Sequence, residues 1–172
     1  MITENILNIA IEICMTTLML QSVSPTGPSC PELLALAELE STFNPKAIGA
    51  VGEIGLYQMR PEYFGKIPSS IKGQTKKAFE LLTKLKTNEC KTDRKFAYIA
   101  CWNVGITKGR KVINAGRPGP YRTNFKKLVS KWKNWYEKEE TRHILSSNLY
   151  RTYSTKRMVA TETLVLQVPG KK

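Results

Sequence analysis

A carboxylate that could act as a general acid lies at the end of a short apolar segment. If residues 33–40 (LLALAELE) form a helix with about 100° between successive residues, Leu33 and Leu36 share a stripe and Glu40 lies within it. Glu38 lies across the helix and can reach solvent. Burial raises the pKa of a carboxyl group, as a general acid working near neutral pH requires. The alternative is a structural carboxylate that binds an arginine or backbone amides.

The residues after this carboxylate form a motif of turn-forming and amide side chains. It comprises Glu40-Ser41, Phe43-Asn44-Pro45, Ala47, Gly52, Gly55-Leu56, Gln58 and Pro61. A second block, ACWNVG, occupies residues 100–105. The ordered pair resembles the signature of the soluble lytic transglycosylases, whose second block reads Ala-Ala-Tyr-Asn-Ala-Gly. The resemblance covers about residues 30–135.

This resemblance implies a fold and an activity. The expected fold is a mainly α, lysozyme-like (goose-type lysozyme/lytic transglycosylase) domain with at most a small β excursion after the catalytic helix. The expected activity is cleavage of the MurNAc-β-1,4-GlcNAc bond of peptidoglycan with formation of 1,6-anhydro-MurNAc ends. Glu40 would be the single catalytic acid/base, because the substrate's own C6 hydroxyl replaces the second carboxylate of ordinary glycosidases. No cofactor and no metal are expected.

The same resemblance suggests which residues bind the glycan. A flexible glycine backbone, amide groups and aromatic rings are suited to sugars. The substrate-binding candidates are Ser41, Gly55, Gln58, Tyr98, Trp102 and Asn103. Structural roles remain the alternatives: helix-end support for Ser41, turn formation for Gly55, and core packing for Tyr98 and Trp102.

Two positions depart from the family pattern. The family usually has tyrosine where this chain has Trp102, so a phenol hydroxyl that could bond the acid or the sugar is missing. Many members have a serine where this chain has Gly49. Both departures concern the orientation of the acid and the substrate rather than the acid itself.

Two other functions are compatible with these residues. One is a goose-type lysozyme-like muramidase, in which water attacks instead of the C6 hydroxyl; the lack of an obvious second carboxylate disfavours it. The other is a non-catalytic basic protein that binds cell wall or nucleic acid. The Glu40-Ser41 pair disfavours this binder, and a nucleic-acid partner is not expected, because few aromatic residues are interleaved with the lysines.

The charge of the chain is large and unevenly distributed. The 172 residues carry a formal net charge of +13. Residues 1–62 hold seven glutamates and two basic residues, whereas the remainder holds 25 basic and seven acidic residues. A cationic surface of this kind attracts polyanions, and we expect anionic envelope polymers to be the partners, beside the peptidoglycan glycan strands. The expected location is the cell envelope (periplasm or extracellular), or the virion or infected host if a phage encodes the chain. A monomer is expected.

The cysteines leave two possibilities open. Cys14, Cys30, Cys90 and Cys101 contain no CxxC pair, and His143 is the only histidine, so an ordinary zinc site is not expected. Two disulfides, with three possible pairings, or four buried thiols fit equally well.

Residue patterns place the helices that must position this site. Helices are expected over 3–20, from Ser29 or Cys30 to about Thr42, over 75–86, over 92–103 with Thr92 as a cap, and from Tyr121 to about Arg142. The inner side of the last helix should carry Phe125, Leu128, Val129, Trp132 and Trp135. Residues 43–60 and 116–120 should be loops.

These elements suggest one domain with a tail. The domain should span residues 1–143 and a basic C-terminal tail residues 144–172, the end of which could be a late strand or irregular. Residues 3–20 are interpreted as a first helix; an export signal is less favoured because no basic residue precedes the apolar run and Glu12 interrupts it. No segment has the roughly 18–20 apolar residues of a membrane span.

Overall fold

A computed structural model of the chain describes residues 2–116, 119–138, 141 and 143–147. It divides into two compact units, Met1–Tyr136 and Glu137–Lys172. The boundary expected between residues 143 and 144 stays a prediction. Of the second unit the structure describes a few residues, of which 143–147 are helical. The late strand or irregular tail considered for residues 163–172 lies outside the described residues.

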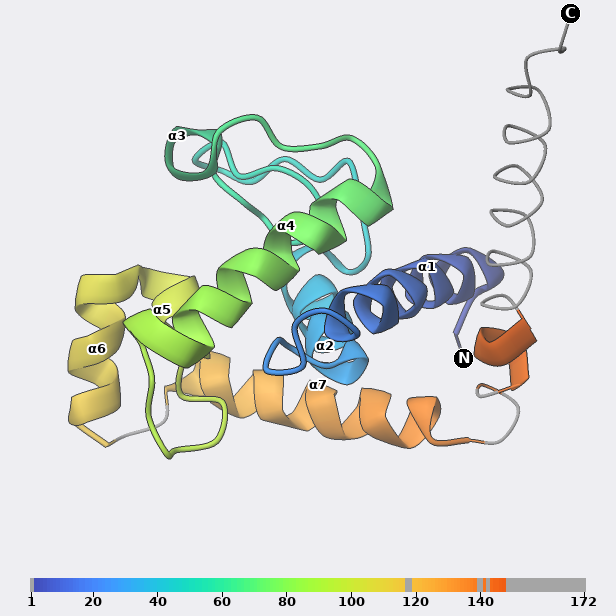
Figure 1. Ribbon diagram of the computed structural model, residues 1–172. Coiled ribbons are helices and arrows are strands. Elements are labelled where there is room, and N and C mark those ends of the chain that lie inside the picture. The colour runs from blue at the N-terminus through green and yellow to red at the C-terminus, as the bar shows by residue number, and fades with distance from the viewer. Residues whose placement is uncertain (1, 117–118, 139–140, 142, 148–172) are drawn as a thin grey trace, which may run out of the picture. The chain divides into compact units, whose positions relative to one another are not determined.

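The first unit is mainly helical, which confirms the predicted fold class (Figure 1). Its elements are α1 (Glu4–Gln21), α2 (Cys30–Ser41), α3 (Pro61–Phe64), α4 (Ile71–Lys84), the π-helical turn η1 (Leu85–Glu89), α5 (Ile99–Val104), α6 (Ile106–Asn114) and α7 (Pro120–Tyr136). Among the described residues, no helix combines the length and apolar character needed to cross a membrane.

Helix α2 forms the centre of this unit. It packs against α7, α1 and α4, and every residue from Cys30 to Ala37 is buried. Its start is fixed by a capping box, in which the Ser29 side chain accepts from the Glu32 N–H and the Glu32 carboxylate accepts from the Ser29 N–H. Its end is set at Thr42, whose backbone is left-handed (φ 52°). The helix predicted from this sequence is therefore confirmed almost to the residue.

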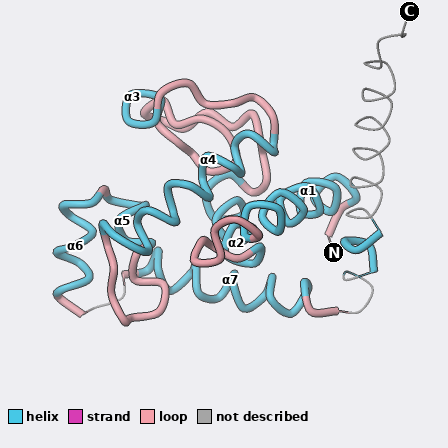
Figure 2. Tube along the Cα trace, in the orientation of Figure 1, coloured by secondary structure: helices cyan, strands magenta, loops and turns pink. Residues whose placement is uncertain are grey.

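The segment between α2 and α4 is a loop that contains the short α3 (Figure 2). Its β character is limited to two isolated bridges, Ile48 with Ile54 and Ile54 with Met59. This agrees with the expected small β excursion. The loop follows directly on Glu40-Ser41, so its residues lie next in the chain to the carboxylate.

The helix expected over 92–103 is wrong in its first half. Helix α5 begins only at Ile99, and Thr92 accepts a hydrogen bond from the Arg94 N–H in a turn instead of capping a helix. Phe96 has a left-handed backbone (φ 59°) and packs edge-on against Phe125 of α7, with 5.6 Å between the ring centroids. This tertiary contact outweighs the helical preference of the segment.

Three smaller differences concern other helices. Helix α4 begins at Ile71, four residues before the predicted start, because Ser70 accepts from the Gly73 N–H as a cap. Helix α6 was not predicted, and α7 ends at Tyr136 rather than near Arg142. On α7, Phe125, Val129 and Trp132 are buried as expected, while Leu128 and Trp135 are half-buried.

The four cysteines form two disulfides. Cys14 of α1 pairs with Cys30 at the start of α2, and Cys90 after η1 pairs with Cys101 of α5. The structure thus selects one of the three possible pairings. Each disulfide attaches a neighbouring segment to an element that carries a candidate site residue.

Candidate active site

Glu40 lies half-buried near the C-terminal end of α2 and is contacted by two other helices. The indole Nε1–H of Trp102 on α5 donates to Glu40 Oε1 at 3.1 Å. The hydroxyl of Tyr121 on α7 donates to the same oxygen. Two donors that lie 62 and 81 residues from Glu40 in sequence thus orient one carboxylate.

The surroundings raise the pKa of Glu40. Desolvation by burial is the largest cause, and the negative charge of Glu53 adds to it, while the hydrogen bonds from Tyr121 and Trp102 partly oppose it. Burial and the adjacent carboxylate also raise the pKa of Tyr121, so its hydroxyl keeps the proton that it donates. A carboxyl group with a raised pKa can hold a proton nearer neutral pH, which is what a general acid needs.

Glu38 has a different environment from Glu40, as the helical geometry predicts. It is half-buried rather than simply exposed, because Lys131 Nζ and Trp132 Nε1 of α7 each donate to it at 2.6 Å. Glu38 thus reaches solvent with part of its side chain, which is 23% exposed, while its carboxylate is bound to α7. Its carboxylate joins α2 to α7 through Lys131 and Trp132.

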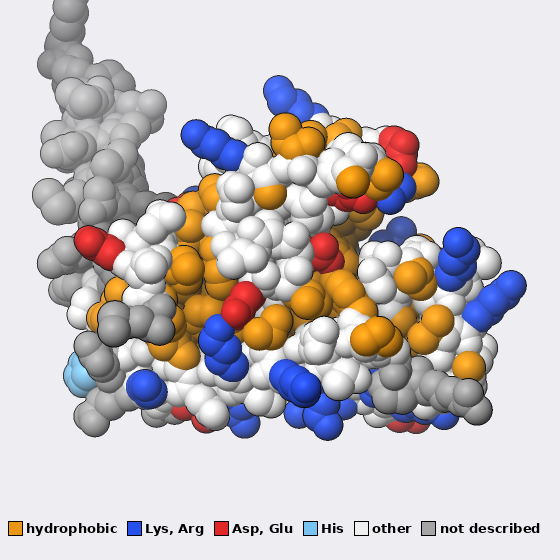
Figure 3. Space-filling model, turned by 180° about the vertical axis from the view of Figure 1, so that it is seen from behind, with side chains coloured by type: hydrophobic (Ala, Val, Ile, Leu, Met, Phe, Trp, Pro, Cys, Tyr) orange, Lys and Arg blue, Asp and Glu red, His pale blue; other side chains and the backbone are white. Residues whose placement is uncertain are grey.

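Aromatic rings continue the site away from Glu40. Phe64 of α3 stacks on Trp102 with 6.4 Å between the centroids and 12° between the planes, and Tyr63, 71% exposed, lies edge-on to Phe64. Seen from behind, the surface is hollowed between the loop that carries α3 and the α5–α6 pair, with hydrophobic side chains around the hollow (Figure 3). Phe64 and Trp102 thus connect the two sides that flank the acid.

The loop after α2 is held by hydrogen bonds to its backbone. Ser41 Oγ lies 2.9 Å from the Leu56 carbonyl oxygen and accepts from the Asn44 N–H. Gln74 of α4, 1% exposed, accepts from the Leu56 N–H at 2.7 Å and donates to the Pro45 carbonyl oxygen at 3.0 Å. Gln74 therefore joins two segments of the loop that follows Glu40, one at Pro45 and one at Leu56.

The predicted substrate-binding residues fall into two groups. Ser41 ends α2 and bonds the loop after it, to which Gly55 and Gln58 belong, and the Gln58 side chain donates to the Gly55 carbonyl oxygen at 3.0 Å. Trp102 contacts Glu40, and Asn103 is exposed beside it. Glycan binding by these five residues stays a prediction.

Tyr98 is set apart from them. It is 4% exposed, and its hydroxyl donates to Glu32 at the other end of α2. Burial and the Glu32 carboxylate raise its pKa well above the usual value. Glycan contact by Tyr98 stays a prediction. Its hydroxyl contacts Glu32, whereas the indole of Trp102 contacts Glu40.

The family of the chain follows from comparison with known proteins. Residues 25–115 match the family model of the transglycosylase SLT domain. The chain belongs to this family. Comparison with curated proteins and with solved structures finds no significant match. The match contains Glu40, its loop and Trp102, and it identifies a lysozyme-like domain of the lytic transglycosylases, which act on peptidoglycan.

The structure offers an explanation for both departures from the SLT pattern. Tyr121 supplies a phenol hydroxyl to Glu40, which the replacement of tyrosine by Trp102 would otherwise remove. A Cβ on Gly49 would collide with the Glu53 carboxylate and lie 2.6 Å from Gln58 Oε1, so a serine there would displace these side chains. In this SLT domain Tyr121 thus provides the hydroxyl that Trp102 lacks, and Glu53 and Gln58 occupy the space beside Gly49.

Three residues of the site were not predicted as such: Phe64, Gln74 and Tyr121. For Tyr121 the sequence predicts only the start of a helix after the loop over residues 116–120. Gln74 gave no signal, because a polar residue at the start of an amphipathic helix is ordinarily exposed.

Among the described residues, no group of three His, Cys, Asp or Glu side chains could hold a metal ion.

The Tyr121 hydroxyl should influence the titration of Glu40. In Tyr121→Phe one donor to the ionised carboxylate is lost, so the pKa of Glu40 should rise further. Since the acid must be protonated to act, the high-pH limb of kcat/KM should move to higher pH. The rate at the optimum should fall about tenfold, because the carboxyl group is less well oriented. A pH–rate profile on purified peptidoglycan measures both effects, and an unmoved limb would contradict the contact.

Proposed function

We propose that this SLT domain cleaves the MurNAc-β-1,4-GlcNAc bond by intramolecular transglycosylation, with Glu40 as acid and then base. The observation that carries the proposal is the Glu40 carboxyl group, half-buried, with a raised pKa and with Trp102 and Tyr121 as donors to a single oxygen. Glu40 Oε2 accepts no bond from these two side chains and can face the substrate.

The proton balance needs one carboxyl group. Protonated Glu40 donates to the glycosidic oxygen as the bond from C1 of MurNAc to that oxygen breaks, and GlcNAc leaves with the proton. The C6 hydroxyl of the same MurNAc attacks C1, and the Glu40 carboxylate takes the hydroxyl proton. The products are a 1,6-anhydro-MurNAc end and a protonated acid ready for the next bond.

Glycan binding is proposed for the groups around the acid. Gln58 and Asn103 offer amide groups for hydroxyl and acetamide partners, and the Trp102 ring offers a face for a sugar. The loop after α2, which Ser41 and Gln74 hold by hydrogen bonds and which contains Gly55, would keep this surface in place. The residues that contact sugar need not include the buried Tyr98.

A hydrolytic outcome is the second candidate, and Glu53 is the observation that favours it. Its charge raises the pKa of Glu40, so a second carboxylate lies within electrostatic reach of the acid. However, backbone N–H groups of Glu53 and Val51, together with Arg60, lower the pKa of Glu53, and Arg60 lies 3.0 Å from it. A carboxylate stabilised in this way is a poor base for water, which favours the transglycosylase.

Mass spectrometry of the fragments released from purified peptidoglycan decides between the two outcomes. The wild type and Glu53→Gln should both release anhydro-MurNAc ends, with rates within about threefold of each other, because Glu53 performs no proton transfer in the proposed reaction. Reducing MurNAc ends that disappear in Glu53→Gln would instead establish a hydrolase that uses Glu53. A wall-binding wild type that releases no fragments would establish the non-catalytic binder.

The setting of the reaction is proposed from the charge. Exposed lysines on α7, including Lys126 and Lys127, would hold the domain on anionic envelope polymers, and their attraction should weaken as salt rises. We propose a cell-envelope location and a monomer that needs no cofactor. A bacterial envelope enzyme and a phage lysis enzyme both suit this chemistry.

A further inference from the structure

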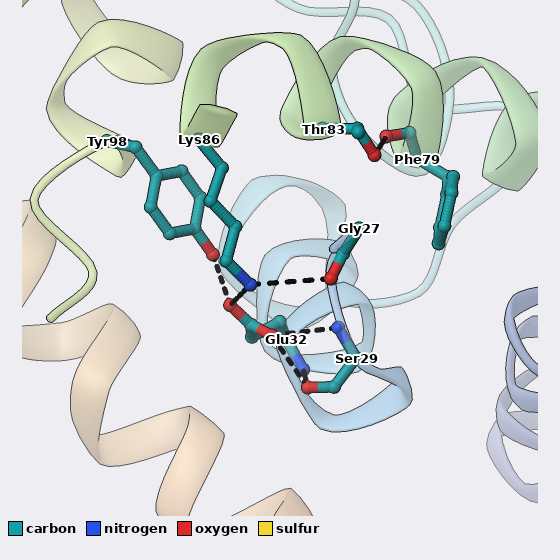
Figure 4. Close-up of polar contacts among 7 residues, drawn as sticks. All are labelled: Gly27, Ser29, Glu32, Phe79, Thr83, Lys86 and Tyr98. Atoms are coloured by element: carbon teal, nitrogen blue, oxygen red, sulfur yellow. Dashed lines mark hydrogen bonds and ion pairs between the residues drawn. The ribbon is translucent and has the colours of Figure 1, made fainter. Parts of the chain in front are cut away.

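A buried polar cluster surrounds Glu32, two helical turns before Glu40 on α2 (Figure 4). Glu32 is 6% exposed. Its Oε2 accepts from the N–H and the hydroxyl of Ser29, each at 2.8 Å. Its Oε1 accepts from the Tyr98 hydroxyl and lies 3.5 Å from Lys86 Nζ. Both oxygens of this carboxylate are therefore used inside the protein.

The Glu32 cluster (Ser29, Glu32, Lys86 and Tyr98) joins parts of the chain that are far apart in sequence. Lys86 belongs to η1 and also donates to the Gly27 carbonyl oxygen at 3.3 Å. Tyr98 immediately precedes α5. Since a buried carboxylate is costly when a partner is removed, the cluster strongly favours one arrangement of these segments. It therefore fixes the beginning of α5 relative to α2.

Helix α5 and the residue before it contact α2 through two side chains four residues apart, and Tyr98 already has a helical backbone (φ −55°, ψ −23°). Tyr98 donates to Glu32, and Trp102 donates to Glu40. On a helix, residues four apart lie on the same side, so one rotation of α5 presents both donors to α2. A change in that rotation that breaks the first bond also turns the second donor away.

Helix α5 depends on such contacts for its orientation. It has six residues and no side-chain cap at its start, and a helix of this length is unstable by itself. It packs on α6 and α7, and the Cys90–Cys101 disulfide ties it to the end of η1. The Tyr98–Glu32 bond adds an attachment on the side that faces α2.

We propose that Tyr98 is a positioning residue for the Glu40 acid. Its bond to Glu32 holds α5 in the rotation at which the Trp102 indole reaches the Glu40 carboxylate. The Glu32 cluster, at one end of α2, would thus orient a donor in the site at the other end. Its catalytic consequence rests on the proposed function of Glu40, whereas the coupling between the bonds does not.

The experiment follows the indole N–H resonance of Trp102 by NMR as the pH is raised through the titration of Glu40. Trp102→Phe identifies this resonance among the three tryptophans. In the wild type it should shift as Glu40 ionises, because the N–H donates to that carboxylate. In Tyr98→Phe, which removes only a hydroxyl, the pH-dependent shift should fall to less than half. The pKa of Glu40 should also rise, since a donor to the ionised form is weakened.

Tyr57→Phe is the matched control. Tyr57 is fully buried, and its hydroxyl bonds Thr75 of α4 at 3.2 Å, away from the Tyr98–Glu32 and Trp102–Glu40 bonds. Its loss should lower the melting temperature but leave the Trp102 titration as in the wild type. If Tyr98→Phe also lowers the melting temperature and leaves that titration unchanged, Tyr98 is only a core residue and the proposal is overturned.

The activity readout separates this proposal from the proposed function. With peptidoglycan, Tyr98→Phe should lower kcat about tenfold with little change in KM, and it should have no further effect on the high-pH limb in a Trp102→Phe background. A wild type without any cleavage would refute the proposed function, yet the NMR titration would still decide the coupling. Should Tyr98→Phe not fold, Glu32→Gln, which keeps the shape and a weaker acceptor, should shift the same resonance in the same direction.

Discussion

Glu40→Gln should lower the rate of glycan cleavage by at least about a thousandfold, since general acid–base catalysis contributes about 10²–10⁴-fold and the proposed reaction uses one group in both roles. The amide keeps the size of the side chain, and its oxygen can still accept from Trp102 and Tyr121. The fold should therefore persist while the transferable proton is lost. Mass spectrometry of released muropeptides, with binding to the wall measured by pelleting, separates loss of chemistry from loss of binding.

Glu38→Gln is the control that the same helix provides. It removes a carboxylate only two residues away, but that carboxylate faces Lys131 and Trp132. Its activity should stay within about threefold of the wild type, because the amide oxygen can still accept from Lys131 and Trp132 and Glu38 takes no part in the proposed proton transfer. A Glu40→Gln variant that keeps a tenth of the wild-type rate, or a Glu38→Gln variant that loses as much as Glu40→Gln, would contradict the assignment of the acid.

Gly55→Ala should destabilise the domain by about 3 kcal/mol. The backbone of Gly55 is left-handed (φ 81°), which costs an alanine about 1–2 kcal/mol. A Cβ there would also overlap the Gln74 amide oxygen and lie 2.7 Å from its Cδ. Gln74 is buried and bonded at both ends, so moving it would leave buried groups unpaired at about 1–3 kcal/mol. The midpoint of thermal unfolding, followed by circular dichroism, should fall by about 10 °C.

Gly52→Ala separates the two causes. Gly52 is also left-handed (φ 87°), but no atom lies within 4 Å of a Cβ placed on it. It should therefore lose only the backbone contribution, about 1–2 kcal/mol. Equal losses in the two variants would show that the contact with Gln74 contributes nothing. The comparison also tests whether Gly55 is constrained by the loop itself rather than by a bound sugar.

Local residue patterns were sufficient for α2 and for the placement of its two glutamates. Ser29 or Cys30 before Pro31 predicts the start of the helix, and Pro45 its end, because these residues act on the backbone next to them. The helical angle between Glu38 and Glu40 places them in different environments, as observed. The family motif lies in the same region for the same reason, since a contiguous segment positions the acid and its loop.

Local patterns failed where a distant contact sets the backbone. Phe96 leaves helical geometry because its ring packs on Phe125, and residues 92–98 cannot indicate this. Pro120 and Tyr121 begin α7, but their sequence does not reveal that the hydroxyl of Tyr121 reaches Glu40. By its residue type and position Gln74 is predicted to be exposed, and only the folded loop buries it.

The sequence by itself thus determined the family, the helical character, the central helix and the position of Glu40 near its end, since these depend on neighbours along the chain. Only the tertiary structure decided the disulfide pairing, the two donors to Glu40 and the attachment of α5 through Tyr98 and Glu32. Trp102 and Tyr121 lie 62 and 81 residues from the carboxylate that they share, and such contacts form only when helices pack. The raised pKa of Glu40 arises from the same packing, because burial, its largest cause, is a property of the assembled domain.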